Sequence, residues 1–413
     1  MGITRNAGRA RVAQETVQSE LPEKAAPRDG REAIDSRVVA ELVAGAFSGE
    51  LHKALEGSVV AGVIGVVEAG ALGVSLIGHA LAAAEGLDSK HAIKQVDRLL
   101  SNRKLQLEQL DLPWVRFVLA ERREVVVALD WTEYAKDGHH VIAANAITSH
   151  GRATPLCWKT VPSAELTDGG RRDAEDVLLL RLHAAVPKDV RVTIVADRGF
   201  GDSALYEFLA REDWDFVIRF RECIHVRTAN ADAAVPAAEL VASNGRARMF
   251  KHVTITAKAH PVAAIVTVKA AGMKDAWCLA TTRLDLTASQ VVAMYGRRFT
   301  IEETFRDTKD PRFGLGLAAV RLKRPDRRDR LILLAALAQA LLTLLGAASE
   351  ATGLDRTLKA NTVTKRTHSL FRQGCLWFKL LRNARPDRRD ALVLKFGEIL
   401  REHQVFRDVF GIL

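Results

Sequence analysis

The residues of this sequence that could do chemistry together are concentrated in the segment 287–309, TASQVVAMYGRRFTIEETFRDTK. A Thr-x-x-Gln pattern at its start is typical of a helix N-terminus, and no proline follows within the segment, so we expect one continuous helix. At about 100° per residue, one stripe of this helix collects Tyr295, Arg298, Glu302, Arg306 and Lys309. A carboxylate between cations can bind a metal ion beside a phosphate, although Arg and Glu four residues apart are also common on solvated helices.

Two aspartates elsewhere stand at the ends of apolar runs that are typical of buried strands. Asp130 follows the run in EVVVALDW (124–131), and Asp197 directly follows VRVTIVA (190–196). Open α/β sheets bind ligands at the carboxyl ends of their strands. A single aspartate in such a place is more often a turn residue or a helix cap. Together with Glu302, however, the two aspartates favour a joint catalytic site.

Asp130, Asp197 and Glu302 are therefore the predicted catalytic residues and metal ligands. Cleavage of a phosphodiester needs an activated nucleophile on one side and a stabilised leaving oxygen on the other, and two divalent ions about 3.5–4 Å apart can supply both. Carboxylates suit two Mg²⁺ or Mn²⁺ ions. The four cysteines are scattered without CxxC spacing, which argues against zinc and against a disulfide framework.

Four other carboxylates compete for the same roles. Glu303 and Asp307 are expected on the outer face of the helix, away from Glu302. Asp202 fits better as the N-cap of the helix that follows it. Glu133 is the remaining rival on the first strand.

The elements that must position these residues follow an α/β order. Three strand-like segments precede a helix, a strand, a helix and a strand, at 124–131, 140–148, 153–161, 173–185, 190–196, 203–211 and 214–220. This order is what a ribonuclease-H-like mixed sheet with helices requires. Alternating segments between 220 and 285 predict a β-rich insertion before Glu302. We divide the chain into a mobile tail (1–34), a helical DNA-binding region (35–120), the first part of the catalytic core (121–220), the insertion (221–285), the second part of the core (286–322) and a helical C-terminal region (323–413).

The spacing Tyr295-x2-Arg298-x3-Glu302-x6-Lys309 resembles the Tyr-Arg-Glu-Lys signature of the DDE transposases of the insertion-sequence-four family. In that family a β insertion stands at the same point of a ribonuclease-H-like core. The resemblance implies that Tyr295, Arg298 and Lys309 hold the phosphate at the transposon end, and we add Arg306 from the same stripe. It also implies that Trp277 can stack on a base extruded during end processing, although a strand tryptophan can equally fill the core.

The N-terminal region contains a pattern similar to a helix-turn-helix motif. Two helical segments, 75–85 and 89–100, flank a Gly-Leu-Asp break. The second segment would present Lys90, Lys94 and Arg98 outward, where they could bind DNA. A plain helical bundle is the alternative, because the apolar positions are shifted by about one residue from the usual template.

The composition favours a polyanionic partner. The 413 residues carry 60 Lys and Arg against 50 Asp and Glu, a net charge of +10, and the pI is about 9.6. The first residues lack the apolar core of a signal peptide, and we expect a cytoplasmic, nucleoid-associated bacterial protein. The apolar segment 331–348 could span a membrane by length, but it carries Gln339 and Thr343 and follows a charged run, so a buried helix is expected.

These observations predict a metal-dependent DNA transposase that cuts double-stranded DNA at terminal inverted repeats and acts as a homodimer in the DNA complex. Two alternatives remain open. A catalytically idle descendant would only bind DNA, as a regulator does. A structure-selective nuclease of the same fold would cut branched DNA without defined ends, and would have no evident use for the Tyr-Arg-Glu-Lys set.

Overall fold

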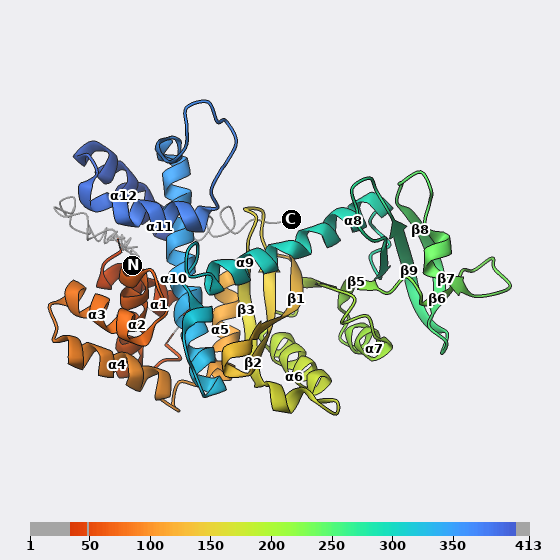
Figure 1. The fold of residues 1–413 in the computed structure, drawn as a ribbon, viewed down its shortest axis with the longest axis horizontal. Helices are drawn as coiled ribbons and strands as arrows, with labels where there is room; N and C mark the ends of the chain where they lie inside the picture. Colours follow the sequence, from red (N-terminus) through yellow and green to blue (C-terminus); the bar gives the residue numbers. More distant parts are fainter. Residues whose placement is uncertain (1–33, 48, 402–413) are drawn as a thin grey trace, which may run out of the picture.

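The computed structural model describes residues 34–47 and 49–401. The predicted mobile tail, residues 1–34, falls outside this part of the chain except for its last residue. The molecule is elongated, with helices gathered at one end, strands in the middle and a further group of strands at the other end (Figure 1). A long helix, α10 (Pro325–Ala351), runs between the helical end and the middle strands.

Helices α1 to α5 precede the sheet: Ser36–Phe47, Lys53–Ala69, Val74–Glu85, Ser89–Ser101 and Leu107–Leu119. The two helices predicted around the Gly-Leu-Asp break are confirmed as α3 and α4. Gly86 ends α3 with φ 67°, a left-handed conformation that favours glycine. The Asp88 side chain then caps α4 by accepting a hydrogen bond from the backbone N–H of His91.

The predicted α/β order is confirmed. Its elements are β1 (Glu124–Tyr134), β2 (His139–Ile147), β3 (Ala153–Pro162), α6 (Gly170–Ala185), β4 (Arg191–Ala196), α7 (Ser203–Arg211) and β5 (Asp215–Phe220). They lie in the sheet in the order β3-β2-β1-β4-β5. β1 is antiparallel to β2 and parallel to β4, and β5 is parallel to β4. This mixed sheet is consistent with the ribonuclease-H-like fold that the sequence predicted.

The strands between β5 and Glu302 continue the same sheet. They are β6 (His225–Arg227), β7 (Val235–Pro236), β8 (Arg248–Ile255), β9 (His260–Val268) and β10 (Trp277–Thr281). β10 pairs antiparallel with β5, and the ten-stranded sheet then runs outward through β9, β8, β6 and β7. The three longer strands match the predicted segments, whereas the short β6 and β7 were not predicted.

The expected single helix over 287–309 is interrupted. It consists of α8 (Ala288–Gly296), a 3-10 turn (Arg297–Phe299) and α9 (Thr300–Lys309). The Thr287–Gln290 capping box is confirmed at its start. A 3-10 turn has three residues per turn, so it brings residues three apart into line. Arg298 lies within this turn, and Tyr295 lies in the last turn of α8 before it.

Two apolar cores hold the sheet from its opposite faces. The larger joins the N-terminal helices, α6 and α10 to one face, and the smaller lies between the other face and α8–α9, with Val291, Tyr295 and Ile301 at its centre. Two further helices, α11 (Leu370–Leu380) and α12 (Pro386–Arg401), pack on α10. α10 is long and apolar enough to cross a membrane, but 89% of its apolar window is buried inside the protein.

Candidate active site

Asp130 and Asp197 lie side by side where the parallel ladder between β1 and β4 ends. Leu129 of β1 pairs with Ala196, the last residue of β4; Asp130 follows within β1, and Asp197 directly follows β4. The residues two positions earlier both belong to the smaller core, beneath α8 and α9. Because side chains alternate along a strand, the carboxylate of Asp130 faces these helices. The sheet alone therefore brings together two of the three predicted ligands.

Arg298 connects Asp130 to Glu302. Its Nη1 donates to Asp130 Oδ2 at 3.0 Å, and its Nη2 donates to Glu302 Oε1 at 2.7 Å. The side chains of Arg298 and Asp130 are 6% and 16% exposed, whereas that of Glu302 is 49% exposed. The guanidinium thus holds positive charge between two of the three carboxylates.

The charges around Asp130 oppose one another. The pKa of Asp130 is raised to about 6, mainly by burial. Arg298 opposes this rise, and the carboxylates of Asp197 and Glu302 add to it. The burial of a carboxylate near two others is stable only with a cation close by. In this structure that cation is Arg298.

The donor set fits hard divalent cations in its chemistry. Within residues 34–47 and 49–401, no three His, Cys, Asp or Glu side chains lie close enough together to hold a metal ion. The guanidinium of Arg298 lies between two of the predicted ligands, Asp130 and Glu302. The carboxylate oxygens of Asp130 and Glu302 already bind the guanidinium cation of Arg298, and oxygens of this kind are the ligands that Mg²⁺ and Mn²⁺ prefer. The residues therefore fit, provided that Arg298 gives way.

The hollow beside these carboxylates has a volume of about 560 Å³ and is lined by Asp130, Trp131, Thr132, Glu302, Phe305, Arg306, Lys309, Asp310, Pro311 and Ala318. Lys309 Nζ donates to Thr132 Oγ1 at 2.9 Å and to the Glu133 carbonyl at 2.8 Å. Burial lowers the pKa of Lys309. Arg306 is exposed and pairs with Glu303. Both cations border the hollow, but Lys309 is bound to β1 in this structure.

Tyr295 is buried, with 1% of its surface exposed. Its ring meets Trp277 of β10 edge-on, with centroids 4.9 Å apart, and burial raises the pKa of its phenol. Trp277 is half-buried and also lies 6.2 Å from the ring of Phe299, which is 44% exposed. Arg298 stacks on the same Phe299 ring at 4.9 Å. An aromatic group of Trp277, Tyr295 and Phe299 therefore adjoins the carboxylates.

One of the rival carboxylates, Asp307, lies where it was not expected. Asp307 was predicted on the outer face of the helix, and this is wrong: it is 6% exposed and accepts a hydrogen bond from Arg152 Nε at 2.5 Å. Glu303 lies 3.6 Å from the same arginine. The cause is the turn between β2 and β3, which covers this side of α9. Ala153, where β3 begins, forms backbone hydrogen bonds with the hydroxyl of Thr304.

The other two rivals have structural partners. Asp202 is the N-cap of α7, as predicted, and accepts from the backbone N–H of Ala204. The carbonyl of Glu133 accepts from Lys309, and its side chain is exposed on β1. Neither shares the position of Asp130 and Asp197.

The predicted DNA-binding residues Lys90, Lys94 and Arg98 are all exposed on α4. Lys94 and Arg98 line a depression of about 670 Å³ together with Ser58, His91, Gln95, Leu99 and Asn102. The depression lies at the helical end of the molecule, away from the carboxylates (Figure 1).

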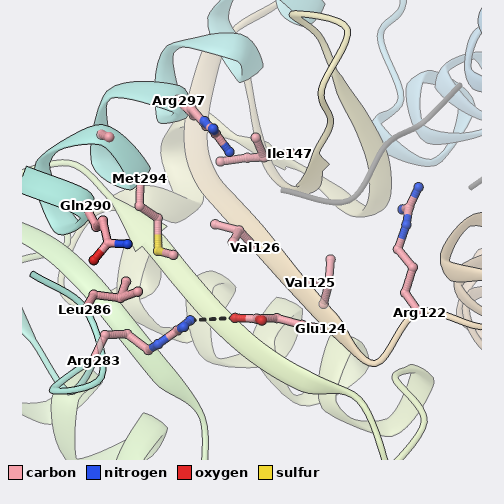
Figure 2. A pocket seen from close by; sticks show the side chains of 11 residues that line it. Arg122, Glu124, Val125, Val126, Ile147, Arg283, Leu286, Gln290, Met294 and Arg297 are labelled. Atoms are coloured by element: carbon pink, nitrogen blue, oxygen red, sulfur yellow. Dashed lines mark hydrogen bonds and ion pairs between the residues drawn. The ribbon is translucent and has the colours of Figure 1, made fainter. Parts of the chain in front are cut away.

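A further cavity of about 310 Å³ opens at the other end of β1. Figure 2 shows Arg283 bound to Glu124 at its floor, and Met294 and Arg297 of the α8 side above it. Arg283 also binds Asp285 and Thr193, so its charge is satisfied within the protein. This cavity is separate from the candidate active site.

Arg171 and Glu175 of α6 also adjoin the carboxylates, and sequence reasoning did not find them. Glu175 Oε1 accepts from the indole N–H of Trp131, the residue after Asp130, at 2.7 Å. Arg171 lies over the same indole, 5.1 Å from the ring centroid. The segment GGRRDAEDV has no distinguishing pattern, and only the fold brings it to β1.

Comparison with known families agrees with this geometry. A sequence model of the family described as transposase DDE domain matches residues 123–341, which is more than half of the chain. The matched region begins just before β1, includes Asp130, Asp197 and Glu302, and ends within α10. No curated protein matches the chain.

Proposed function

Because the chain belongs to the transposase DDE domain family, we propose that it is the transposase of an insertion sequence, which cuts DNA at the ends of its element and joins them to target DNA. The observation that carries this proposal is that Asp130 and Asp197 meet at the end of the β1–β4 ladder, with Glu302 linked to Asp130 through Arg298. These three carboxylates are the proposed catalytic residues.

DDE transposases use divalent metal ions, and we propose two Mg²⁺ or Mn²⁺ ions held by Asp130, Asp197 and Glu302. Bound there, the ions would activate a water or 3′-hydroxyl and stabilise the leaving oxygen. The role of the protein is to hold the carboxylates ionised and in place. β1 and β4 fix the two aspartates, and α9 supplies Glu302 from the more exposed side.

The cations around the hollow are the proposed phosphate contacts. Arg298 can grip a phosphate through two N–H groups, and Lys309 acts as a point charge. Both cations now bind oxygens of the protein. A DNA phosphate would replace Asp130 and Glu302 as the partner of Arg298, and Thr132 as a partner of Lys309. Arg306 lies at the rim, and Tyr295 supports Arg298 from within the core.

The finer assignment rests on the Tyr-Arg-Glu-Lys spacing, which supports membership in the insertion-sequence-four family. The partner is then double-stranded DNA with terminal inverted repeats, bound by a homodimer in the bacterial nucleoid. Trp277 is proposed to stack on an extruded base, supported by its half-buried position beside exposed Phe299. Lys90, Lys94 and Arg98 of α4 are proposed to bind the ends.

The test is Mg²⁺-dependent cleavage of a duplex that carries the inverted repeat flanking the gene, with a branched duplex of unrelated sequence beside it. We expect cleavage at the end of the repeat and little cutting of the branched DNA. Preference for the branched duplex would indicate a structure-selective nuclease. Binding of the repeat without cleavage of either duplex would indicate a regulator.

A further inference from the structure

Arg171, at the start of α6, lies beside the carboxylates from the opposite face of the sheet. α6 packs into the larger core through Leu178 and Leu182, whereas α8 and α9 cover the smaller one (Figure 1). Asp197 Oδ1 and Arg171 Nη2 both approach Gly199: a Cβ on this glycine would lie 3.0 Å and 3.8 Å from them. The guanidinium therefore reaches the edge of the sheet where β4 ends.

Arg171 is held in this position by two contacts. Its Nε donates to Glu175 Oε1 at 3.2 Å, and its guanidinium lies over the Trp131 ring. The same Glu175 oxygen accepts from the indole of Trp131, so the three side chains fix one another. These contacts use the Nε side of the guanidinium, whereas Nη2 faces the loop after Asp197. The side chain is nevertheless 51% exposed, so a ligand in solution can reach it.

The position complements that of Arg298. Arg298 lies on the α9 side of Asp130, and Arg171 lies on the α6 side of Asp197. A DNA strand that places its scissile phosphate over the two aspartates must carry its next phosphates to either side of them. Arginine held by stacking and by Nε can still bind phosphate through its terminal N–H groups.

We propose that Arg171 is a second DNA-phosphate anchor, which binds a backbone phosphate on the side of the carboxylates opposite to Arg298. This inference rests on the proposed function, because it assumes that DNA lies across Asp130 and Asp197. It names a contact that lies outside the Tyr-Arg-Glu-Lys spacing. Arg171 touches the DNA strand, whereas Glu175 positions Arg171.

The neighbouring Arg172 provides a matched control. It is 55% exposed, carries the same charge and lies in the same turn of α6, but it pairs with Asp202 at the start of α7. Binding of the inverted-repeat duplex is measured without divalent ions for the wild type, Arg171→Ala, Arg171→Lys, Arg172→Ala and Glu175→Gln. Each protein is also tested against a series of duplexes in which single phosphates are replaced by neutral methylphosphonates.

We expect Arg171→Ala to bind about tenfold more weakly and to lose about one unit of salt slope. At one phosphate, the methylphosphonate should weaken binding by the wild type and by Arg172→Ala, but not by Arg171→Ala. Arg171→Lys, which keeps the charge, should recover part of the affinity and guards against a folding defect in the alanine variant. Thermal unfolding of each variant is recorded alongside.

Two results would overturn the proposal. One is a methylphosphonate profile of Arg171→Ala that matches the profile of Arg172→Ala at every phosphate. The other is a salt slope of Arg171→Ala equal to that of the wild type. Glu175→Gln keeps the cation and changes only its setting, so it should lose less affinity than Arg171→Ala. Cleavage of the unmodified duplex by the wild type with Mg²⁺ is measured in parallel. Failure of cleavage would count against the proposed function, while the binding profile still decides the role of Arg171.

Discussion

Arg298 should compete with metal ions for the carboxylates, so Arg298→Gln is expected to bind Mn²⁺ more tightly than the wild type when DNA is absent. The guanidinium donates to Asp130 at 3.0 Å and to Glu302 at 2.7 Å, and both hydrogen bonds must break before an ion can lie between these side chains. The variant has neither bond to break. It also lacks the positive charge that repels the ion.

The pair with Asp130 dominates the expected magnitude. Glu302 is 49% exposed, and exposed ion pairs contribute about 1 kcal/mol or less. The bond to the shielded Asp130 contributes about 1.5–3 kcal/mol, as is typical of hydrogen bonds to charged groups. The dissociation constant for Mn²⁺ should therefore fall about 10-fold to 100-fold. Arg298 lowers the pKa of Asp130, so the loss of Arg298 raises this pKa, and both proteins are titrated at about pH 8, above the wild-type value of about 6.

The assay is a Mn²⁺ titration followed by the electron paramagnetic resonance signal of the free ion. Arg297→Gln is the matched control, because Arg297 precedes Arg298 but lines the separate cavity beside Met294 (Figure 2). Its removal should change the affinity by less than about twofold, since exposed charges are screened. Competition by Arg298 is refuted if Arg298→Gln binds Mn²⁺ no more tightly than the wild type, or if Arg297→Gln tightens binding as much.

Three further predictions concern other parts of the molecule. Burial raises the pKa of Asp329 from 3.8 to about 7, so folding favours its protonated form and stability should fall as the pH rises between these values. Asp329→Asn keeps an acceptor for Thr160 and should abolish this fall in thermal unfolding; an unchanged pH profile would contradict it. Trp277→Ala should slow end processing by the equivalent of about 1–3 kcal/mol with initial DNA binding intact, whereas a loss of thermal stability alone would mark a core residue. Lys94→Ala and Arg98→Ala should each reduce the salt slope of end binding by roughly one unit, and unchanged slopes would leave α4 as part of a plain helical bundle.

The sheet could be predicted because its information is local. Each longer strand is an apolar run closed by turn residues, and a strand order of this kind places Asp130 of β1 beside the end of β4. The positions of Asp130 and Asp197 follow from that order and from the alternation of side chains. The short β6 and β7 carry no apolar pattern of their own and depend on pairing with β8 and with each other.

The surroundings of Glu302 could not be predicted, because they depend on residues that are distant in sequence. The 3-10 turn at Arg297–Phe299 has no separate signal in the sequence and changes the helix phase that a uniform 100° per residue assumes. Asp307 is buried by Arg152, which lies on the turn between β2 and β3. A helix considered alone is expected to have one buried side and one solvated side, whereas α9 is covered both by the sheet and by the turn between β2 and β3.

The central claim is that Glu302 completes the site formed by Asp130 and Asp197, and the most direct test compares Glu302→Gln with Glu303→Gln. Mg²⁺-dependent cleavage of the repeat and DNA affinity are measured for both variants, beside Asp130→Asn and Asp197→Asn. Glu302→Gln keeps the shape of the side chain but removes its charge, so cleavage should fall by several orders of magnitude while DNA binding persists or tightens. The same result is expected for Asp130→Asn and Asp197→Asn. Glu303→Gln should cleave nearly as the wild type does, since this carboxylate pairs with Arg152 and Arg306. Normal cleavage by Glu302→Gln, or an inactive Glu303→Gln, would contradict the account.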